Sequence, residues 1–102
     1  MSFTVTHRLG RMEKNPPLAS FKALIAELDD SDREHTDVSL SHESGWTLSV
    51  YNQGTVVWEN VQEGEPRHMR GLSTGRILEL LERLAQGEID TLDGEPWETG
   101  YP

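Results

Sequence analysis

The residues that come nearest to a metal site are two histidines and the acids beside them. His35 and Asp37 stand two residues apart, so on a strand their side chains lie on the same side. His42 falls seven residues after His35, which places it on the opposite face of that strand. Two ligands are too few for a zinc or transition-metal site. We therefore expect no bound metal and no cofactor.

A compact cationic segment lies at residues 66–70 and contains Arg67 and His68. It follows three acids, Glu59, Glu63 and Glu65. Local ion pairing, which contributes about 0–1 kcal/mol per exposed pair, is the favoured interpretation. The alternative is a site for a small anion or carboxylate around Arg67 and His68, because guanidinium groups bind carboxylates strongly.

The sequence shows no other signature of catalysis. Gly71 and Gly75 do not form a phosphate-binding loop, because no lysine follows them. Serines and histidines are present, but they form no recognisable pattern of nucleophile, base and orienting acid. Pairs of carboxylates occur on any acidic surface, so they do not indicate a glycosidase. We therefore predict that the protein is not an enzyme.

The charge of the chain indicates a class of partner. Its 102 residues include 18 acids and 9 bases, and the net charge is −9. Residues 27–43 carry seven acids against Arg33, and residues 77–102 carry seven acids against Arg83, so each stretch has a net charge of −6. Such a surface repels nucleic acid and anionic membranes. It suits a basic protein partner, or it serves solubility alone.

Two groups of acids and two aromatic residues are the candidate partner-binding residues. They are Asp29, Asp30, Asp32, Glu34 and Asp37, then Glu59, Glu63 and Glu65, and finally Trp97 and Tyr101. The structural alternative for the first group is that it ends a helix, although carboxylates at a helix C-terminus oppose the macrodipole. The aromatic pair lies among acids. It either anchors an interface, where Trp and Tyr are enriched, or pins the C-terminus to the body.

Hydrophobic alternation predicts the strands that position these residues. Strands are expected at residues 2–9, 36–42, 46–51 and 55–61, and residues 67–70 are expected to add a short one. His7 falls on the apolar row of the first strand, which favours a histidine whose hydrogen bonds are satisfied in the core or at an edge. Residues 11–17 and 62–66 are predicted to be loops, and the tail after Gly94 is predicted to be irregular.

Apolar spacing of three and four residues predicts two helices. The first stripe runs from Leu18 to Leu28. Ser73 is the expected N-cap of the second helix, and Gly87 suits its C-terminus. Glu79 and Arg83, four residues apart, are expected to pair on its outer face.

The order of these elements predicts an α+β fold. We expect an antiparallel meander sheet of four to five strands with two helices packed on one face, in a single domain of residues 1–102. The chain has no cysteine, no secretory signal and no run of about 18–20 apolar residues. These features fit a cytoplasmic protein that does not span a membrane.

Several short motifs carry a resemblance to known proteins. They are Glu34-His35-Thr36-Asp37-Val38-Ser39-Leu40, Trp46, Trp58-Glu59-Asn60, Pro66-Arg67-His68-Met69, and Pro96-Trp97 with Gly100-Tyr101. Across roughly residues 34–101 the chain resembles small acidic bacterial proteins of the immunity type, which neutralise toxins by binding them. The resemblance implies a compact α+β binding protein without catalysis, and it transfers no individual contact residue.

Three functional hypotheses follow. The first is a non-enzymatic binding protein whose acidic surface occludes a basic protein partner, such as a toxin, in the manner of an immunity protein or inhibitor. The second is a small-ligand binder or minor enzyme that uses His35, Arg67 and His68 on the polar sheet face. The third is a structural homodimer, joined through the sheet edge or the aromatic tail.

Overall fold

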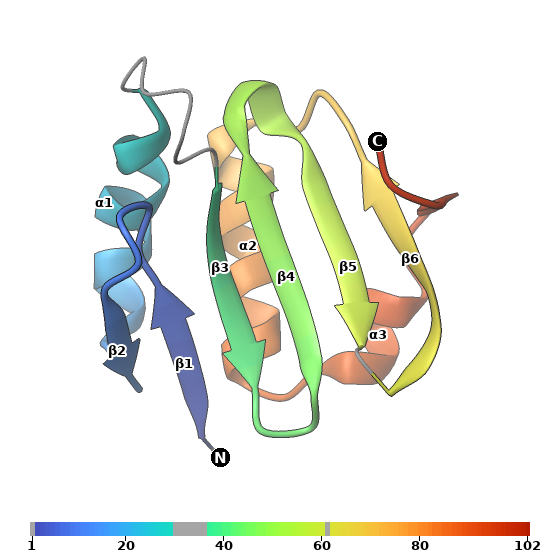
Figure 1. Cartoon of the computed structure of the whole chain (residues 1–102), viewed down its shortest axis with the longest axis horizontal. Helices are drawn as coiled ribbons and strands as arrows, with labels where there is room; N and C mark the ends of the chain where they lie inside the picture. Colours follow the sequence, from blue (N-terminus) through green and yellow to red (C-terminus); the bar gives the residue numbers. More distant parts are fainter. Residues whose placement is uncertain (1, 30–36, 61) are drawn as a thin grey trace.

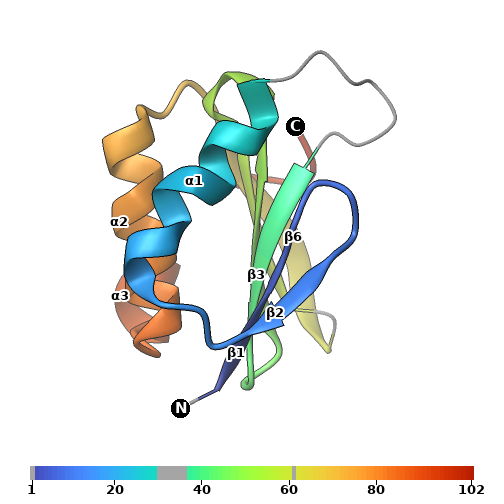
Figure 2. The ribbon, with the colours of Figure 1, turned by 90° about the vertical axis from the view of Figure 1, so that its left-hand side faces the viewer.

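The fold is an antiparallel sheet of seven strands that carries its helices on one face (Figures 1 and 2). The structure is a computed structural model and describes residues 2–29, 37–60 and 62–102. The strands lie in the order β2-β1-β3-β4-β5-β6-β7. They are β1 (Phe3–Thr6), β2 (Met12–Lys14), β3 (Asp37–His42), β4 (Trp46–Tyr51), β5 (Val56–Asn60), β6 (Glu63–Met69) and β7 (Glu98–Thr99). The helices are α1 (Phe21–Ala26), α2 (Thr74–Ala85) and α3 (Ile89–Asp93), with short 3-10 turns η1 (Leu18–Ser20), η2 (Glu27–Asp29) and η3 (Asn52–Gly54).

The α+β class and the antiparallel sheet are confirmed, and the predicted four to five strands and two helices approximate the seven strands and three α-helices of the described residues. β2 lies in the predicted loop at 11–17, β6 includes most of the predicted loop at 62–66, and β7 lies in the tail predicted to be irregular. β2 and β7 are too short to show a period of two. In β6, Glu, Gly and Pro are residues depleted in strands. Cross-strand pairing defines these segments, and the pairing of β5 with β6 shifts register between Trp58 and Asn60.

The helical predictions hold in outline and differ in detail. The stripe from Leu18 to Leu28 forms η1, α1 and η2 in succession, and the residues around Ile89 form the third helix, α3, where a short turn was expected. The Ser73 Oγ accepts a hydrogen bond from the Arg76 N–H, which confirms the N-cap of α2. Gly87, at φ 78°, follows the end of α2 as predicted. None of the helices in the described residues is long and apolar enough to cross a membrane.

The core lies between the sheet and the helical layer. Alternation along β3 and β4 sends one apolar row toward the helices, where it meets the stripe of α2. The fully buried members include Leu40, Leu48, Val50, Leu80, Leu81 and Leu84. The other row of each strand faces away from the helices and is largely polar. The same alternation that builds the core therefore also builds a polar outer surface.

The β4–β5 turn meets the segment that leads into α2 at a single glycine. Gly54 has φ +76°, and its carbonyl accepts a hydrogen bond from the Leu72 N–H at 3.0 Å. A Cβ at this position would lie 2.3 Å from the Leu72 carbonyl oxygen. Only glycine satisfies both requirements, so the turn and the start of α2 are fixed relative to each other.

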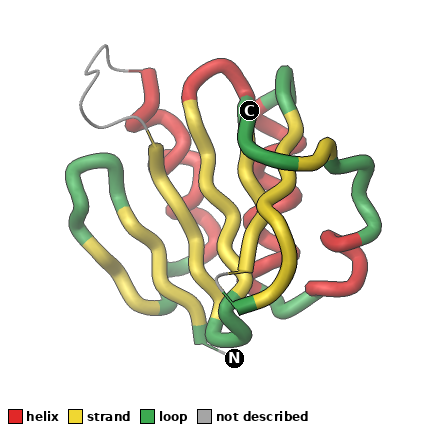
Figure 3. The backbone as a smooth tube through the Cα atoms, turned by 45° about the vertical axis from the view of Figure 1, so that its right-hand side comes forward, coloured by secondary structure: helices red, strands yellow, loops and turns green. Residues whose placement is uncertain are grey.

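The C-terminal segment passes around β6, from the helical side of the sheet to the opposite side. On the helical side, Trp97 stacks on Trp58 with ring centroids 5.9 Å apart, and Trp58 stacks on Trp46 at 4.5 Å. β7 then pairs with β6, and the Gly100 N–H donates to the Pro66 carbonyl. Figure 3 shows this segment against the strands near the C-terminus. Trp97 thus pins the C-terminus to the body of the protein.

Candidate functional site

One face of the sheet is left without helices, and we call it the open face (Figure 2). None of the helices in the described ranges lies over it. Its residues come from the outer rows of four adjacent strands. They are Asp37, Ser39 and Ser41 of β3, Thr47, Ser49 and Tyr51 of β4, Val57 and Glu59 of β5, and His68 of β6. Serine, threonine, tyrosine and carboxylate side chains dominate this face, and all of its residues except Ser49, Val57 and His68 are partly exposed.

Two acids and two tyrosines of the open face interact with one another, and we call them the acidic tyrosine cluster; Glu59 is opposite Thr47, four residues before Tyr51 on β4. Asp37 and Tyr51 are opposite each other in the β3–β4 pairing. The Tyr101 Oη–H donates to Glu59 Oε2 at 2.7 Å, which brings the C-terminal segment onto this face. In the described part of the chain, no cationic side chain forms an ion pair with Asp37 or Glu59. The cluster therefore concentrates negative charge beside two aromatic rings.

The negative charge of the cluster contributes to the raised pKa values of both tyrosines. Burial raises the pKa of Tyr51 above 10.0, and the nearby carboxylates of Asp37 and Glu59 raise it further. The hydrogen bond to Glu59 is the main cause of the raised pKa of Tyr101. A negative potential disfavours the tyrosinate in both cases. The same potential favours a cation placed on this face.

The β6 side of the open face is closed by the C-terminal segment. His68 is 7% exposed, and its Nδ1 donates to the Gly100 carbonyl at 2.7 Å. Its Nε2 lies 3.6 Å from a Glu98 carboxylate oxygen. His68 is thus occupied by contacts that hold the tail in place.

The structure brings three of the predicted partner-binding residues together and separates others from them. Asp37, Glu59 and Tyr101 share the acidic tyrosine cluster. Trp97 lies on the helical side, so it does not share a surface with Tyr101, and Glu65 is an exposed residue of β6. The remaining predictions, Asp30, Asp32 and Glu34, lie outside the described residues, as do the side chains of Asp29 and Glu63. Tyr51 was missed, although its place on the polar row of its predicted strand was a usable signal.

Arg67 and His68 do not form the anion site that the sequence allowed. Arg67 is opposite Trp58 in the β5–β6 pairing and His68 is opposite Val57, so the two side chains lie on opposite faces of the sheet. Arg67 forms an ion pair with Asp93 of α3 and lies 5.9 Å from the Trp46 ring centroid. The Arg67 guanidinium lowers the pKa of the Asp93 carboxyl. Arg67 therefore fastens α3 to the tryptophan stack, and its partner is distant in sequence rather than local. His35, the third member of that hypothesis, lies outside the described residues.

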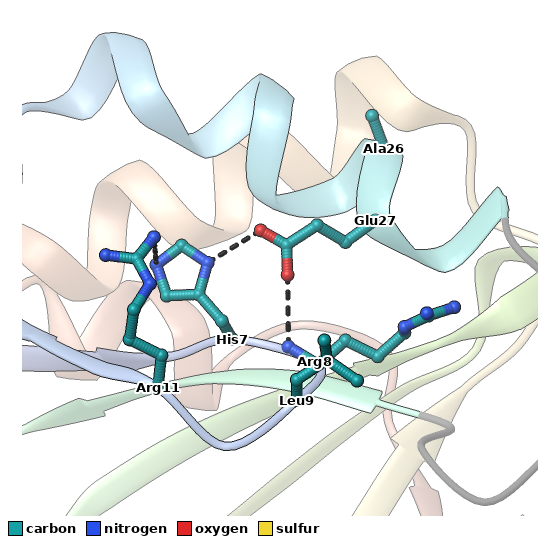
Figure 4. Close-up of a pocket in the computed structure, with 6 residues that line it drawn as sticks. All are labelled: His7, Arg8, Leu9, Arg11, Ala26 and Glu27. Carbon is teal, nitrogen blue, oxygen red and sulfur yellow. Dashed lines mark hydrogen bonds and ion pairs between the residues drawn. The ribbon is translucent and has the colours of Figure 1, made fainter. Parts of the chain in front are cut away.

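A second candidate site lies at the β2–β1 edge of the sheet, between the β1–β2 connection and the end of α1 (Figure 4). It is a pocket of about 500 Å³ lined by His7, Arg8, Leu9, Arg11, Ala26 and Glu27, and we call it the histidine pocket. Sequence reasoning did not identify this pocket, because Glu27 joins it from 20 residues away. The run His7-Arg8-Leu9-Gly10-Arg11 was the available signal.

His7 is the organising residue of this pocket. Its Nδ1 lies 2.6 Å from Glu27 Oε2, and its Nε2 contacts the Glu13 carboxylate. Burial lowers the pKa of His7, but its hydrogen bonds to the carboxylates of Glu27 and Glu13 outweigh this effect and leave the pKa raised above 6.5. Glu27 Oε1 also accepts from the Arg8 backbone N–H at 3.0 Å. The prediction that His7 is a satisfied histidine is confirmed.

The two sites differ in the charge of the chain around them. Residues 1–26 contain four basic residues, Arg8, Arg11, Lys14 and Lys22, against Glu13 alone, which is a net +3. The net charge of the whole chain is −9, so residues 27–102 carry −12. Five of the six residues that line the histidine pocket therefore belong to a basic segment of an acidic protein, whereas Glu27 and the acidic tyrosine cluster belong to the acidic remainder.

Neither site contains a recognised metal centre. Within the described ranges, no three His, Asp or Glu side chains are grouped so that they could hold a metal ion. Comparisons with protein families, curated proteins and solved structures find no match for this chain. The function is therefore argued from the geometry of the two sites.

Proposed function

We propose that this protein is a non-enzymatic binding protein that occludes a basic protein partner with the open face of its sheet. The observation that carries the proposal is the acidic tyrosine cluster, in which Asp37 and Glu59 lie beside Tyr51 and Tyr101 on a face without helices. The concrete form is an inhibitor or immunity-type protein that covers a basic surface of a cytoplasmic toxin or enzyme.

The chemistry of the cluster supports a cationic partner. Carboxylates without cationic partners attract lysine and arginine side chains, and the effect is greatest on the rate of encounter. Tyrosine rings bind guanidinium and ammonium groups through their faces, and they are enriched among interface residues that contribute most to affinity. Tyr101 is 62% exposed, so most of its surface is free to be covered by a partner.

The dimensions of the open face also support a protein partner. The molecule measures 32 × 28 × 24 Å, and the sheet lies roughly in the plane of the two longer extents (Figure 1). A stable protein–protein interface buries about 800 Å² on each partner. These extents leave room for such an interface on the broad side of the molecule, although Ser49, Val57 and His68 of the open face are themselves buried. The charge of the face disfavours nucleic acid as the occupant.

The test is affinity capture from native cell lysate with three immobilised baits. These are the wild type, the double variant Asp37→Asn/Glu59→Gln, and the control Glu82→Gln/Glu88→Gln. Both variants lose two negative charges, but the control loses them in the helical layer. We expect a basic protein to be retained at low salt by the wild type and the control, and to be lost from the Asp37/Glu59 variant.

Two outcomes would overturn the proposal. Equal loss of the retained protein from both variants would show that net charge, and not the acidic tyrosine cluster, holds it. Retention of no basic protein by any bait would remove the partner class. Capture of the chain by itself would instead favour the homodimer.

A further inference from the structure

The histidine pocket has the size of a small-molecule site. Its volume of about 500 Å³ lies within the roughly 300–1,000 Å³ that is typical of ligand pockets. Leu9 is 68% exposed although it lines the pocket, and Ala26 is exposed beside it. A ligand with an apolar part would cover both side chains, which water now contacts.

The pocket also contains an accessible cation. The Arg11 side chain is 67% exposed, and Figure 4 shows its guanidinium next to the His7 ring. Its contacts with His7 at 3.2 Å and with Glu13 at 3.4 Å both use Nη2. A guanidinium carries five N–H donors in a planar fork, so the donors on Nη1 and Nε can serve a ligand.

The acids of the pocket are already matched to donors of the protein. Glu27 accepts from His7 through Oε2 and from the Arg8 N–H through Oε1, and Glu13 accepts from His7 and Arg11. An incoming anion therefore meets the exposed guanidinium of Arg11, while the carboxylates of Glu13 and Glu27 are turned toward internal partners.

We infer that the histidine pocket binds a small organic carboxylate, whose carboxylate group pairs with Arg11 and whose apolar part lies on Leu9 and Ala26. This site is separate from the acidic tyrosine cluster and does not depend on the function proposed for it. The raised pKa of His7 supports the inference, because it keeps the ring cationic to higher pH. Binding of the carboxylate raises the His7 pKa further, since linkage is reciprocal.

The test uses three probes that separate charge from apolar contact. Benzoate carries both features, benzamide has the same shape without the charge, and inorganic phosphate has charge without an apolar part. Amide NMR spectra of the whole protein report binding at each residue. We expect benzoate to shift the resonances of Arg8, Leu9 and Ala26 saturably and to raise the pKa of the His7 ring, with benzamide and phosphate at least about fivefold weaker.

A matched pair of variants assigns the effect to Arg11. Arg11→Gln is expected to weaken benzoate about threefold to fivefold, because it removes one exposed charge pair. Arg70→Gln removes the same charge at the end of β6, which β3, β4 and β5 separate from β1, and it is expected to leave benzoate affinity unchanged. Equal binding of benzamide or of phosphate, equal weakening by both variants, or the absence of a saturable shift with benzoate would each overturn the inference.

Discussion

The histidine pocket and the acidic tyrosine cluster differ in whether their carboxylates are paired with cations. In the pocket, Glu13 and Glu27 each face His7, and the ring is held between opposite charges. In the cluster, Asp37 and Glu59 face tyrosines, and no cation in the described residues pairs with them. Paired charges hold the side chains of the pocket in fixed positions, whereas unpaired carboxylates create a negative electrostatic potential that attracts a cationic partner. This difference underlies the two proposals, which are a small anion as the ligand of the pocket and a basic protein surface as the partner of the cluster.

The largest expected effect is a loss of stability when Trp97, which anchors the C-terminal segment, is removed. This change should disturb the acidic tyrosine cluster and leave the histidine pocket intact. Trp97→Ala loses the stacking on Trp58 and the hydrogen bond from Nε1 to the Leu92 carbonyl. We expect the free energy of unfolding in urea to fall by about 2–4 kcal/mol. We also expect the pKa of Tyr101 to fall toward 10.0 as its contact with Glu59 loosens, while the His7 resonances stay in place.

Trp97→Phe is the control for that variant, because it keeps an aromatic ring and loses only part of the contact. Its expected cost is less than about 1.5 kcal/mol. Disturbance of the His7 resonances as large as that of the Tyr101 resonances would show that the two regions are not independent.

The second effect is a pH dependence that belongs to the pocket alone. The pKa of His7 is raised in the folded protein, so its stabilisation is present in full below about pH 6.5, the unfolded value. It is lost as the pH rises through the folded pKa. We expect His7→Gln to lower the free energy of unfolding by about 1–3 kcal/mol at about pH 5, through the loss of two charge-assisted hydrogen bonds. The difference from wild type shrinks as the pH rises, and urea unfolding at several pH values measures it.

A constant difference between His7→Gln and wild type at every pH would contradict the assignment of a raised pKa to His7.

The third effect sharpens the description of the cluster. Glu59→Gln removes a negative charge that raises the pKa of both Tyr51 and Tyr101. We expect both tyrosine pKa values to fall toward 10.0 in an ultraviolet titration. Glu65→Gln, on β6, serves as the control and is expected to leave them unchanged. Unaltered tyrosine pKa values in Glu59→Gln would mean that the cluster does not carry the proposed potential.

The smallest effect concerns Arg11. Because this side chain is two-thirds exposed, Arg11→Gln is expected to change the free energy of unfolding by less than about 0.5 kcal/mol. The same variant should still lose affinity for benzoate, because Arg11 contributes to ligand binding and not to the stability of the fold. A loss of stability greater than 1.5 kcal/mol, measured in urea, would place Arg11 in the framework of the pocket instead.

Much of the sheet could be predicted from local pattern. Alternation at residues 36–42 and 46–51 correctly placed Asp37, Ser49 and Tyr51 on the face opposite the core, because a period of two reports burial directly. Ser73 and Gly87 marked the ends of α2 through local hydrogen bonding and backbone conformation. These features depend on neighbours within a few residues.

The features that could not be predicted from the sequence depend on contacts between residues that are far apart along the chain. The separation of Trp97 from Tyr101 requires the C-terminal segment to pass around β6, and no periodic pattern encodes that path. The contact between His7 and Glu27 joins a strand end to a helix end, and helix ends are set by tertiary packing. For the same reason, the sequence did not show that Arg67 forms its ion pair with Asp93 and not with the acids beside it in the chain.

The central proposal is that the acidic tyrosine cluster docks a basic protein. The most direct measurement is the association rate constant of the captured partner with wild type, with Asp37→Asn/Glu59→Gln and with Glu82→Gln/Glu88→Gln, at several salt concentrations. We predict that the cluster variant slows association about threefold to tenfold at low salt and flattens its salt dependence, while the control changes it less than about twofold. Equal slowing by both variants, or no slowing by either, would contradict the claim.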